Sequence, residues 1–319
     1  MAAPTNTVTT VANIGIREDL ENDIYRIAPE ETPFTSNIGK TKSSSTFHEW
    51  QTETIEAVDA SNFQLEGDDV ATLDSARLTT RVGNYTQIFR KSGAVAGTQE
   101  AVTLAGREDE MDRQKMLAGL ALKRDVEARL IGNYASNAQS GGTPRKAGGA
   151  LAWITSNDSR GSGGSDGGFG SGVVAAATNA GSTRTFTEAL VKTMLATAFG
   201  NGARFSQAYM GGTHKQAFSA FTGIADIRSE VSGKSLATIY GAADMYVSDF
   251  GSITLIPHPY GLTRDALFVD PKMVAVATLR PVNSKALASS GDNEKFLLTT
   301  EKTLVVRNER GLGVVADLT

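Results

Sequence analysis

Residues 107–134 read REDEMDRQKMLAGLALKRDVEARLIGNY, and this stretch decides the class of fold. Acidic residues occupy its beginning, where negative charge favours the positive N-terminal end of a helix. Apolar residues follow at helical spacing: Met116, Leu120, Leu122, Val126, Leu130 and Tyr134. At 1.5 Å per residue such a helix is about 40 Å long, which is more than a small domain needs. Gly119 in its middle costs about 1 kcal/mol against Ala and therefore predicts a close neighbour or a bend.

Two acid-before-base pairs at helical spacing, Asp109–Arg113 and Asp125–Arg129, are expected to support this helix. Before it, residues 16–25 predict a short helix, and Glu31-Thr32-Pro33-Phe34 predicts an extended segment because the residue before a proline avoids helical angles. After it, helices are expected at 185–200 and 213–222. The expected strands are 244–248, 252–257, 266–269, 274–279, 295–300 and 303–308. No strand–helix–strand repeat appears, so the sequence predicts an α+β fold.

Composition excludes several classes of protein. The chain has 319 residues, 33 glycines and no cysteine, so it has neither disulfides nor thiolate chemistry. Its formal net charge of −4 argues against broad phosphate binding, which needs surplus Lys and Arg. Neither a membrane-spanning stretch nor a signal peptide is apparent, and we expect a protein made and kept in the cytoplasm, without membrane contacts.

The charges are distributed unevenly between residues 43 and 91. From Ser43 to Ala76 there is no base but many acids, whereas from Arg77 to Lys91 there are bases and no acid. Strand-forming residues flank the turn-like Glu66-Gly67-Asp68-Asp69, which predicts a two-stranded arm with one acidic and one basic limb. An isolated ribbon is marginally stable, so it should lie on another surface. The alternative is a long loop whose acids are merely solvated.

Motifs for catalysis or metal binding are incomplete. Gly163-Gly164-Ser165-Asp166-Gly167 matches the letters of a hydrolase elbow but lies in the glycine–serine tract 161–172, which predicts a surface loop. Ser232-Gly233-Lys234-Ser235 resembles the end of a phosphate loop, yet Arg228 occupies the position of the first glycine. His48-Glu49 lacks the second histidine of a zinc protease. We therefore expect no catalytic, cofactor-binding or metal-binding residues.

Three stretches resemble the major head proteins of one group of tailed bacteriophages. The first is residues 15–34, a helix followed by Thr32-Pro33-Phe34. The second is Asn84-Tyr85-Thr86-Gln87-Ile88 with Gly97-Thr98-Gln99 and the helix after it, and the third is residues 290–295 with 301–308. These anchors span nearly the whole chain in the order of that family.

The resemblance implies the Hong Kong 97-type capsid fold. It implies an N-terminal arm at 1–45, an extended loop at 46–92, a peripheral domain at 93–183 and 262–319, and an axial domain at 184–261. It implies a structural protein, not an enzyme, that forms hexamers and pentamers of an icosahedral head. The implied partners are a portal protein, scaffold and cement proteins, and double-stranded DNA held by weak non-specific contacts. The implied location is the virion, after assembly in the host cytoplasm.

The charged limbs supply the candidates for contacts between subunits. They are Glu49, Glu53, Glu56, Glu66, Asp68, Asp69, Arg77, Arg81, Arg90 and Lys91. Two alternatives to a phage head stay open. One is a protein nanocompartment of the same fold, and the other is a serine hydrolase that uses Ser165.

Overall fold

The computed structural model describes residues 26–56, 58–67, 76, 78–106, 109–170, 173–176, 180–221 and 244–319. Several features of the sequence analysis lie outside these residues. They are the helix at 16–25, the segment Ser232–Ser235, and the candidates Asp68, Asp69 and Arg77.

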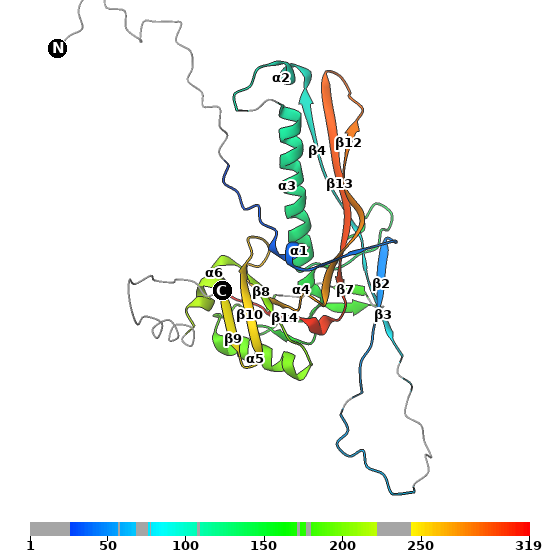
Figure 1. Ribbon diagram of the computed structural model, residues 1–319, viewed down its shortest axis with the longest axis vertical. Helices are drawn as coiled ribbons and strands as arrows, with labels where there is room; N and C mark the ends of the chain where they lie inside the picture. Colours follow the sequence, from blue (N-terminus) through cyan, green and yellow to red (C-terminus); the bar gives the residue numbers. More distant parts are fainter. Residues whose placement is uncertain are drawn as a thin grey trace, which may run out of the picture.

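The long helix forms as α3 (Glu110–Ile131) and runs along the body of the molecule (Figure 1). Asp109 caps its start, since the Asp109 carboxylate accepts a hydrogen bond from the Asp112 backbone N–H at 2.8 Å. Leu122, Val126 and Leu130 are buried as predicted, whereas Met116 is 53% exposed.

The two ion pairs expected within α3 are replaced by others. Arg113 pairs with Glu110 at 2.9 Å, one residue closer than Asp109, and Asp125 reaches across to Lys91 at 2.6 Å. The prediction of a close neighbour at Gly119 is also wrong for the described chain. A Cβ built at Gly119 meets no atom within 4 Å.

A long sheet packs against α3 in the order β1-β12-β13-β4. Its strands are β1 (Gly39–Lys42), β12 (Val274–Leu287), β13 (Asn293–Val306) and β4 (Gln87–Ala96). Strands expected at 295–300 and 303–308 form the single strand β13, since no glycine or proline separates them. Facing α3, Phe89, Val95, Phe296, Leu298 and Leu304 join its apolar residues in one core.

A second body surrounds a six-stranded sheet with the order β5-β14-β11-β8-β10-β9. The strands are β5 (Asp158–Ser159), β14 (Leu312–Val315), β11 (Ala266–Val269), β8 (Gln207–Met210), β10 (Gly251–Pro257) and β9 (Met245–Ser248). Helices α5 (Glu188–Gly200) and α6 (Gly212–Ser219) supply Val191, Met194 and Phe218 to its core. β11 and β14 pair in this sheet, whereas β12 and β13 lie beside α3, so residues 262–319 contribute to both bodies.

A smaller sheet has the order β2-β3-β7-β6. Its strands are β2 (Phe47–Thr52), β3 (Thr80–Tyr85), β7 (Val173–Ala176) and β6 (Gly168–Gly170). The glycine tract is therefore more ordered than a plain surface loop, because β6 lies in it and the Gly161 N–H donates to Asp317 at 2.9 Å. Short helices complete the fold: α1 (Pro33–Asn37), α2 (Gly97–Ala101), α4 (Ala150–Trp153) and the 3-10 helix η2 (Glu309–Gly311).

Candidate assembly surfaces

The predicted extended arm has a paired stem and an unpaired outer part. β2 and β3 pair antiparallel from Phe47 opposite Tyr85 to Thr52 opposite Thr80. The described residues beyond this stem, 53–56, 58–67 and 78–79, form no strand. The ribbon also ends earlier than residue 92, because β4 turns into the long sheet and pairs with β13. The loop projects from the body at the end away from α2 (Figure 1).

Large apolar side chains lie uncovered on this loop. The exposed fractions are 97% for Ile55, 98% for Val58, 79% for Phe63, 81% for Leu65 and 87% for Leu78. A solvated loop needs none of these side chains, and an exposed apolar group of this size is typical of an interaction site. We call residues 53–66 the outer loop.

The charged candidates fall into three groups. Glu49 and Arg81 pair with each other across the stem at 3.2 Å, so their opposite charges act within the loop. Lys91 pairs with Asp125 of α3. Glu53, Glu56 and Glu66 are exposed on the outer loop, and Arg90 is exposed on β4, in the long sheet.

The motif Asn84-Tyr85-Thr86-Gln87 joins the loop stem to the body. The fully buried Asn84 amide donates to the carbonyls of Gly148 (3.1 Å) and Leu304 (2.9 Å) and accepts from the Gly148 N–H at 2.9 Å. Gln87 accepts from the Ala147 N–H at 3.1 Å. These bonds satisfy backbone groups that no strand partner reaches. The sequence analysis identified this motif only through the family resemblance and did not predict these hydrogen bonds.

Glu301 is the centre of a buried ionic cluster missed by the sequence analysis. Its carboxylate, 3% exposed, accepts from Thr86 at 2.7 Å, Arg145 at 2.7 Å and Arg280 at 2.9 Å. Burial alone raises the pKa of this carboxyl, but the three hydrogen bonds and the charge of Arg145 outweigh burial and leave the pKa below its ordinary value. The cluster ties β13 to β12 and to the 145–149 segment.

A second buried cluster holds the N-terminal arm on α3. Glu127 is fully buried and accepts hydrogen bonds from the backbone N–H groups of Phe34 (2.7 Å) and Thr35 (2.9 Å). The His258 Nε2 lies 2.9 Å from the same carboxylate. Phe34 itself is fully buried against Tyr209, with ring centroids 5.4 Å apart. Thr32-Pro33-Phe34 therefore marks the point where the arm is anchored.

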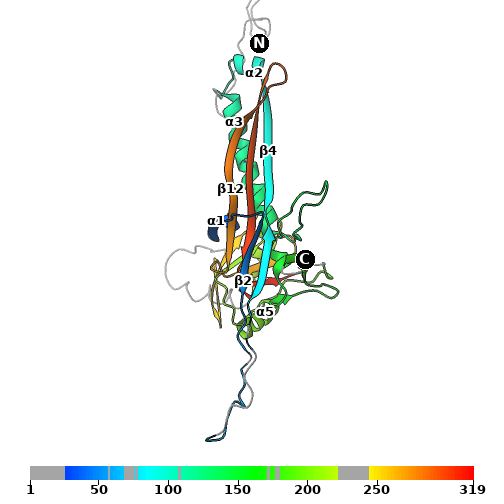
Figure 2. The same ribbon diagram turned by 90° about the vertical axis from the view of Figure 1, so that its right-hand side faces the viewer.

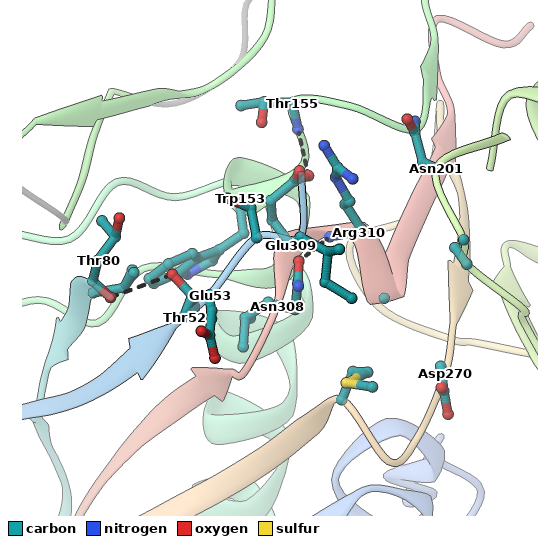
Figure 3. A pocket seen from close by; sticks show the side chains of 18 of the residues that line it. Thr52, Glu53, Thr80, Trp153, Thr155, Asn201, Asp270, Asn308, Glu309 and Arg310 are labelled. Carbon is teal, nitrogen blue, oxygen red and sulfur yellow. Dashed lines mark hydrogen bonds between the residues drawn. The ribbon is translucent and has the colours of Figure 1, made fainter. Parts of the chain in front are cut away.

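A hollow of about 640 Å³ opens where the loop stem meets both bodies (Figure 3). Trp153, Val82, Met273 and Val306 give it an apolar part, and Glu309 lies beside them. The Glu309 carboxylate accepts from Ser156 and from the Thr155 N–H, so its role here is to hold the chain in place. The described residues that line the hollow include no histidine, lysine or serine, which gives it no base or nucleophile of those types.

Within the residues that the structure describes, Ser165 and the three histidines are not grouped into a catalytic site. Ser165 is followed by strand β6, whereas a hydrolase elbow requires a helix after its serine. His48 lies on β2, His214 on α6, and His258 is held by Glu127. Among the described residues, no three His, Cys, Asp or Glu side chains are grouped to hold a metal ion. In the same part of the chain, no helix is long and apolar enough to cross a membrane.

Comparison with known proteins places this geometry in a family. A curated major capsid protein of Escherichia phage Phieco32 is 34% identical over 135 residues, which are 42% of this chain and 38% of that protein. The matched stretch thus spans well under half of the curated relative. The capsid of Cyanophage A-1(L) superposes with a TM-score of 0.68 at 11% identity and covers 98% of this chain and 100% of that one.

The SrpI encapsulin of Synechococcus elongatus superposes with a TM-score of 0.56 at 11% identity and covers 98% of this chain and 96% of that one. These likenesses confirm the Hong Kong 97-type fold expected from the sequence. The family model described as SU10 major capsid protein matches residues 3–319. The chain therefore belongs to the SU10 major capsid protein family.

Proposed function

We propose that this chain is the shell subunit of a phage head, which self-assembles into hexamers and pentamers around double-stranded DNA. The observation that carries the proposal is the outer loop, whose apolar side chains are uncovered in the described chain. Family membership supports assembly into a capsid located in the virion. Portal, scaffold and cement proteins are further proposed partners, and the proposed place of assembly is the host cytoplasm.

We further propose a division of labour along the chain. In it the arm, residues 1–45, and the loop, residues 46–92, contact neighbouring subunits, and the anchor of the arm at Glu127 supports this division. Residues around α3 and the long sheet form the peripheral body, and those around α5 and α6 form the axial body. Each body has its own apolar core, so each keeps its shape while the arm and loop adapt to neighbours.

Hydrogen exchange tests the role of the loop. Free subunits and assembled shells are compared over residues 46–92. We expect amides of the outer loop to be protected only in shells, because few backbone hydrogen bonds join its described residues. Equal exchange in both states contradicts the proposal.

Contacts with DNA should be few and non-specific, because the chain has 31 bases against 35 acids. Purified subunits should bind duplex DNA weakly at physiological salt in a filter-binding or anisotropy assay. Tight binding under those conditions contradicts this part of the proposal.

The nanocompartment alternative rests on the likeness to the SrpI encapsulin. The contents of native particles distinguish a phage head from a nanocompartment. A phage head holds double-stranded DNA and carries a tail, whereas a nanocompartment is empty or holds protein cargo.

A further inference from the structure

The glycine tract joins two sheets of the molecule. Asp158 and Ser159 form β5, an edge strand of the six-stranded sheet, and Gly168–Gly170 form β6, an edge strand of the small sheet. Figure 1 shows both sheets beyond the same end of α3, and Figure 2 shows the stem strand β2 and the helix α5 at that end. Because the small sheet also contains β2 and β3, this connection holds the base of the loop.

A turn brings the two ends of the connection together. The Gly164 N–H donates to the Gly161 carbonyl at 3.0 Å, and Gly163 has a φ of +84°, a backbone conformation that favours glycine. The turn places Asp166 beside Arg160, whose Nε donates to the Asp166 carboxylate at 2.9 Å. The letters of the hydrolase elbow thus form a turn that presents an aspartate.

Arg160 lies against two aspartates. A carboxylate oxygen of Asp158 is 2.9 Å from the same Arg160 Nε, so the two carboxylate oxygens are at most twice that distance apart. The Nε carries one hydrogen atom, and this hydrogen is directed to Asp166. Asp158 has the Asp166 carboxyl group as its hydrogen-bonding neighbour. A hydrogen bond between two carboxyl groups needs a proton on one of them, because ionised carboxylates only accept.

The charge around this pair also favours a bound proton. The charged groups that face the pair and Arg160 from neighbouring segments are Arg184, Arg264, Asp265 and Asp317. Arg264 pairs with Asp317 at 3.3 Å, and Arg184 donates to the Ser159 carbonyl. With the pair and Arg160 included, four aspartates face three arginines. One proton on these carboxyl groups therefore balances the charge.

The pKa values agree with this charge balance. Burial raises the pKa of the Asp158 carboxyl above its ordinary value, the charge of Asp166 raises it further, and Arg160 opposes both effects only in part. Burial and the charge of Asp317 likewise raise the pKa of Asp265. A carboxyl whose folded pKa is raised takes up a proton on folding. Its stabilising effect is therefore present at low pH and is lost as pH rises through the folded pKa.

We propose that Asp158 and Asp166 share one proton and that this proton ties the small sheet to the six-stranded sheet. The carboxyl that keeps the proton donates to its neighbour, and the remaining carboxylate accepts from Arg160. Loss of the proton places two anions beside one guanidinium and weakens the connection. The proposal concerns the single subunit and does not depend on shell formation.

The Glu301 cluster responds to pH in the opposite direction. The pKa of Glu301 is lowered, so its bonds among β12, β13 and the 145–149 segment weaken as pH falls through the folded pKa. Acid thus strengthens the glycine tract and weakens the long sheet of the same subunit. The subunit therefore has two proton sites of opposite sign, and a change of pH moves stability from one sheet to another.

Native-state hydrogen exchange of the free subunit tests the shared proton. Protection factors, which correct for the effect of pH on the intrinsic exchange rate, are measured at pH 7 and pH 4. We expect the Gly164 amide and the amides of β6 to be about fivefold more protected at pH 4, the ratio that one net hydrogen bond supplies. The Gly148 amide, which donates to Asn84, should gain no protection.

Carboxyl carbon-13 NMR of the wild-type subunit gives a second, direct readout. The Asp158 signal should titrate with a midpoint above 3.8, the ordinary value for this side chain. This measurement needs no variant, so it decides the protonation of Asp158 even if a substitution prevents folding.

Three variants make the test specific. Asp158→Asn supplies an amide N–H in place of the shared proton, so protection should stay high at both pH values. Asp158→Ala removes the donor and should leave protection at the low level at both. Asp244→Asn is the matched control, because Asp244 is exposed directly before β9 of the same body and pairs with Lys215. It should keep the wild-type pH dependence. Circular dichroism and urea unfolding check that each variant folds.

Two kinds of result overturn the proposal. Protection of Gly164 that is equal or lower at pH 4, or an Asp158 midpoint at or below 3.8, shows that the pair holds no proton. An Asp158→Asn protein that keeps the wild-type pH dependence assigns the proton to another group. Neither result affects the proposed shell function, which is tested on assembled particles.

Discussion

Replacing Glu127 by Gln should release the N-terminal arm from α3. The Glu127 carboxylate accepts from Phe34 N–H and His258 on one oxygen and from Thr35 N–H on the other. A Gln amide has one acceptor oxygen, so its NH₂ group must face one of these donors. The variant loses a charge-assisted hydrogen bond and leaves a buried N–H without an acceptor, a cost of about 2 kcal/mol.

This cost raises the free energy of the anchored arm only. In the released state, the backbone N–H groups of the arm bind water in both the wild type and the variant. Opening of residues 33–38 should thus become about 30-fold more frequent, since 1.4 kcal/mol corresponds to a factor of ten. Native-state hydrogen exchange of the free subunit measures it at the amides of Phe34, Thr35 and Ile38. Amides in the middle of β13 should keep their rates.

Asp125→Asn is the matched control on the same helix, because Asp125 is exposed and pairs with Lys91 instead of the arm. It should leave exchange at Phe34 and Thr35 unchanged. Unchanged exchange in the Glu127→Gln protein refutes the assignment of Glu127 as the anchor.

Three further predictions concern stability and catalysis. Gly119→Ala should stabilise the free subunit by about 1 kcal/mol in urea unfolding, because the added methyl meets no atom of the described chain; a destabilised subunit contradicts the open surroundings. Glu301→Gln should destabilise the subunit by about 3 kcal/mol at pH 7. Because the folded pKa of Glu301 is lowered, its contribution is present above the unfolded pKa and is lost as pH falls through the folded pKa, so the two proteins should converge in acid; a gap that is constant with pH argues against the ionic role. Ser165→Ala should assemble like the wild type, and labelling of Ser165 by a serine-hydrolase probe revives the enzyme hypothesis.

The spacing of apolar residues along the sequence predicted several helices and strands. The predicted apolar stripe of α3 is buried at Leu122, Val126 and Leu130 but not at Met116, and the strand at 266–269 has the predicted bounds. The stem of the loop followed from strand-forming residues on both sides of an acidic turn. The family resemblance supplied the fold, which composition and periodicity alone do not reach.

Contacts between residues that are distant in the sequence could not be predicted from local patterns. Glu301 and Arg145 are 156 positions apart, and Glu127 and His258 are 131 apart, so no local spacing indicates either cluster. The break expected between residues 300 and 303 was wrong, because no glycine or proline separates the two segments. The Glu301 side chain, which lies between them, is satisfied within the sheet by residues from other segments.

Pairing between strands that are distant in the sequence also explains why part of the predicted basic limb does not lie in the loop. Alternating strand residues continue from β3 into β4, but β4 pairs with β13, which is distant in sequence. Arg90 therefore lies in the long sheet instead of the loop.

Electron microscopy of the purified full-length chain tests the central claim most directly. The account predicts closed icosahedral shells built from hexamers and pentamers, in which density for residues 53–66 of each copy lies on a neighbouring subunit. Monomers or small oligomers under all assembly conditions contradict the account, and so do shells in which each loop contacts only its own chain.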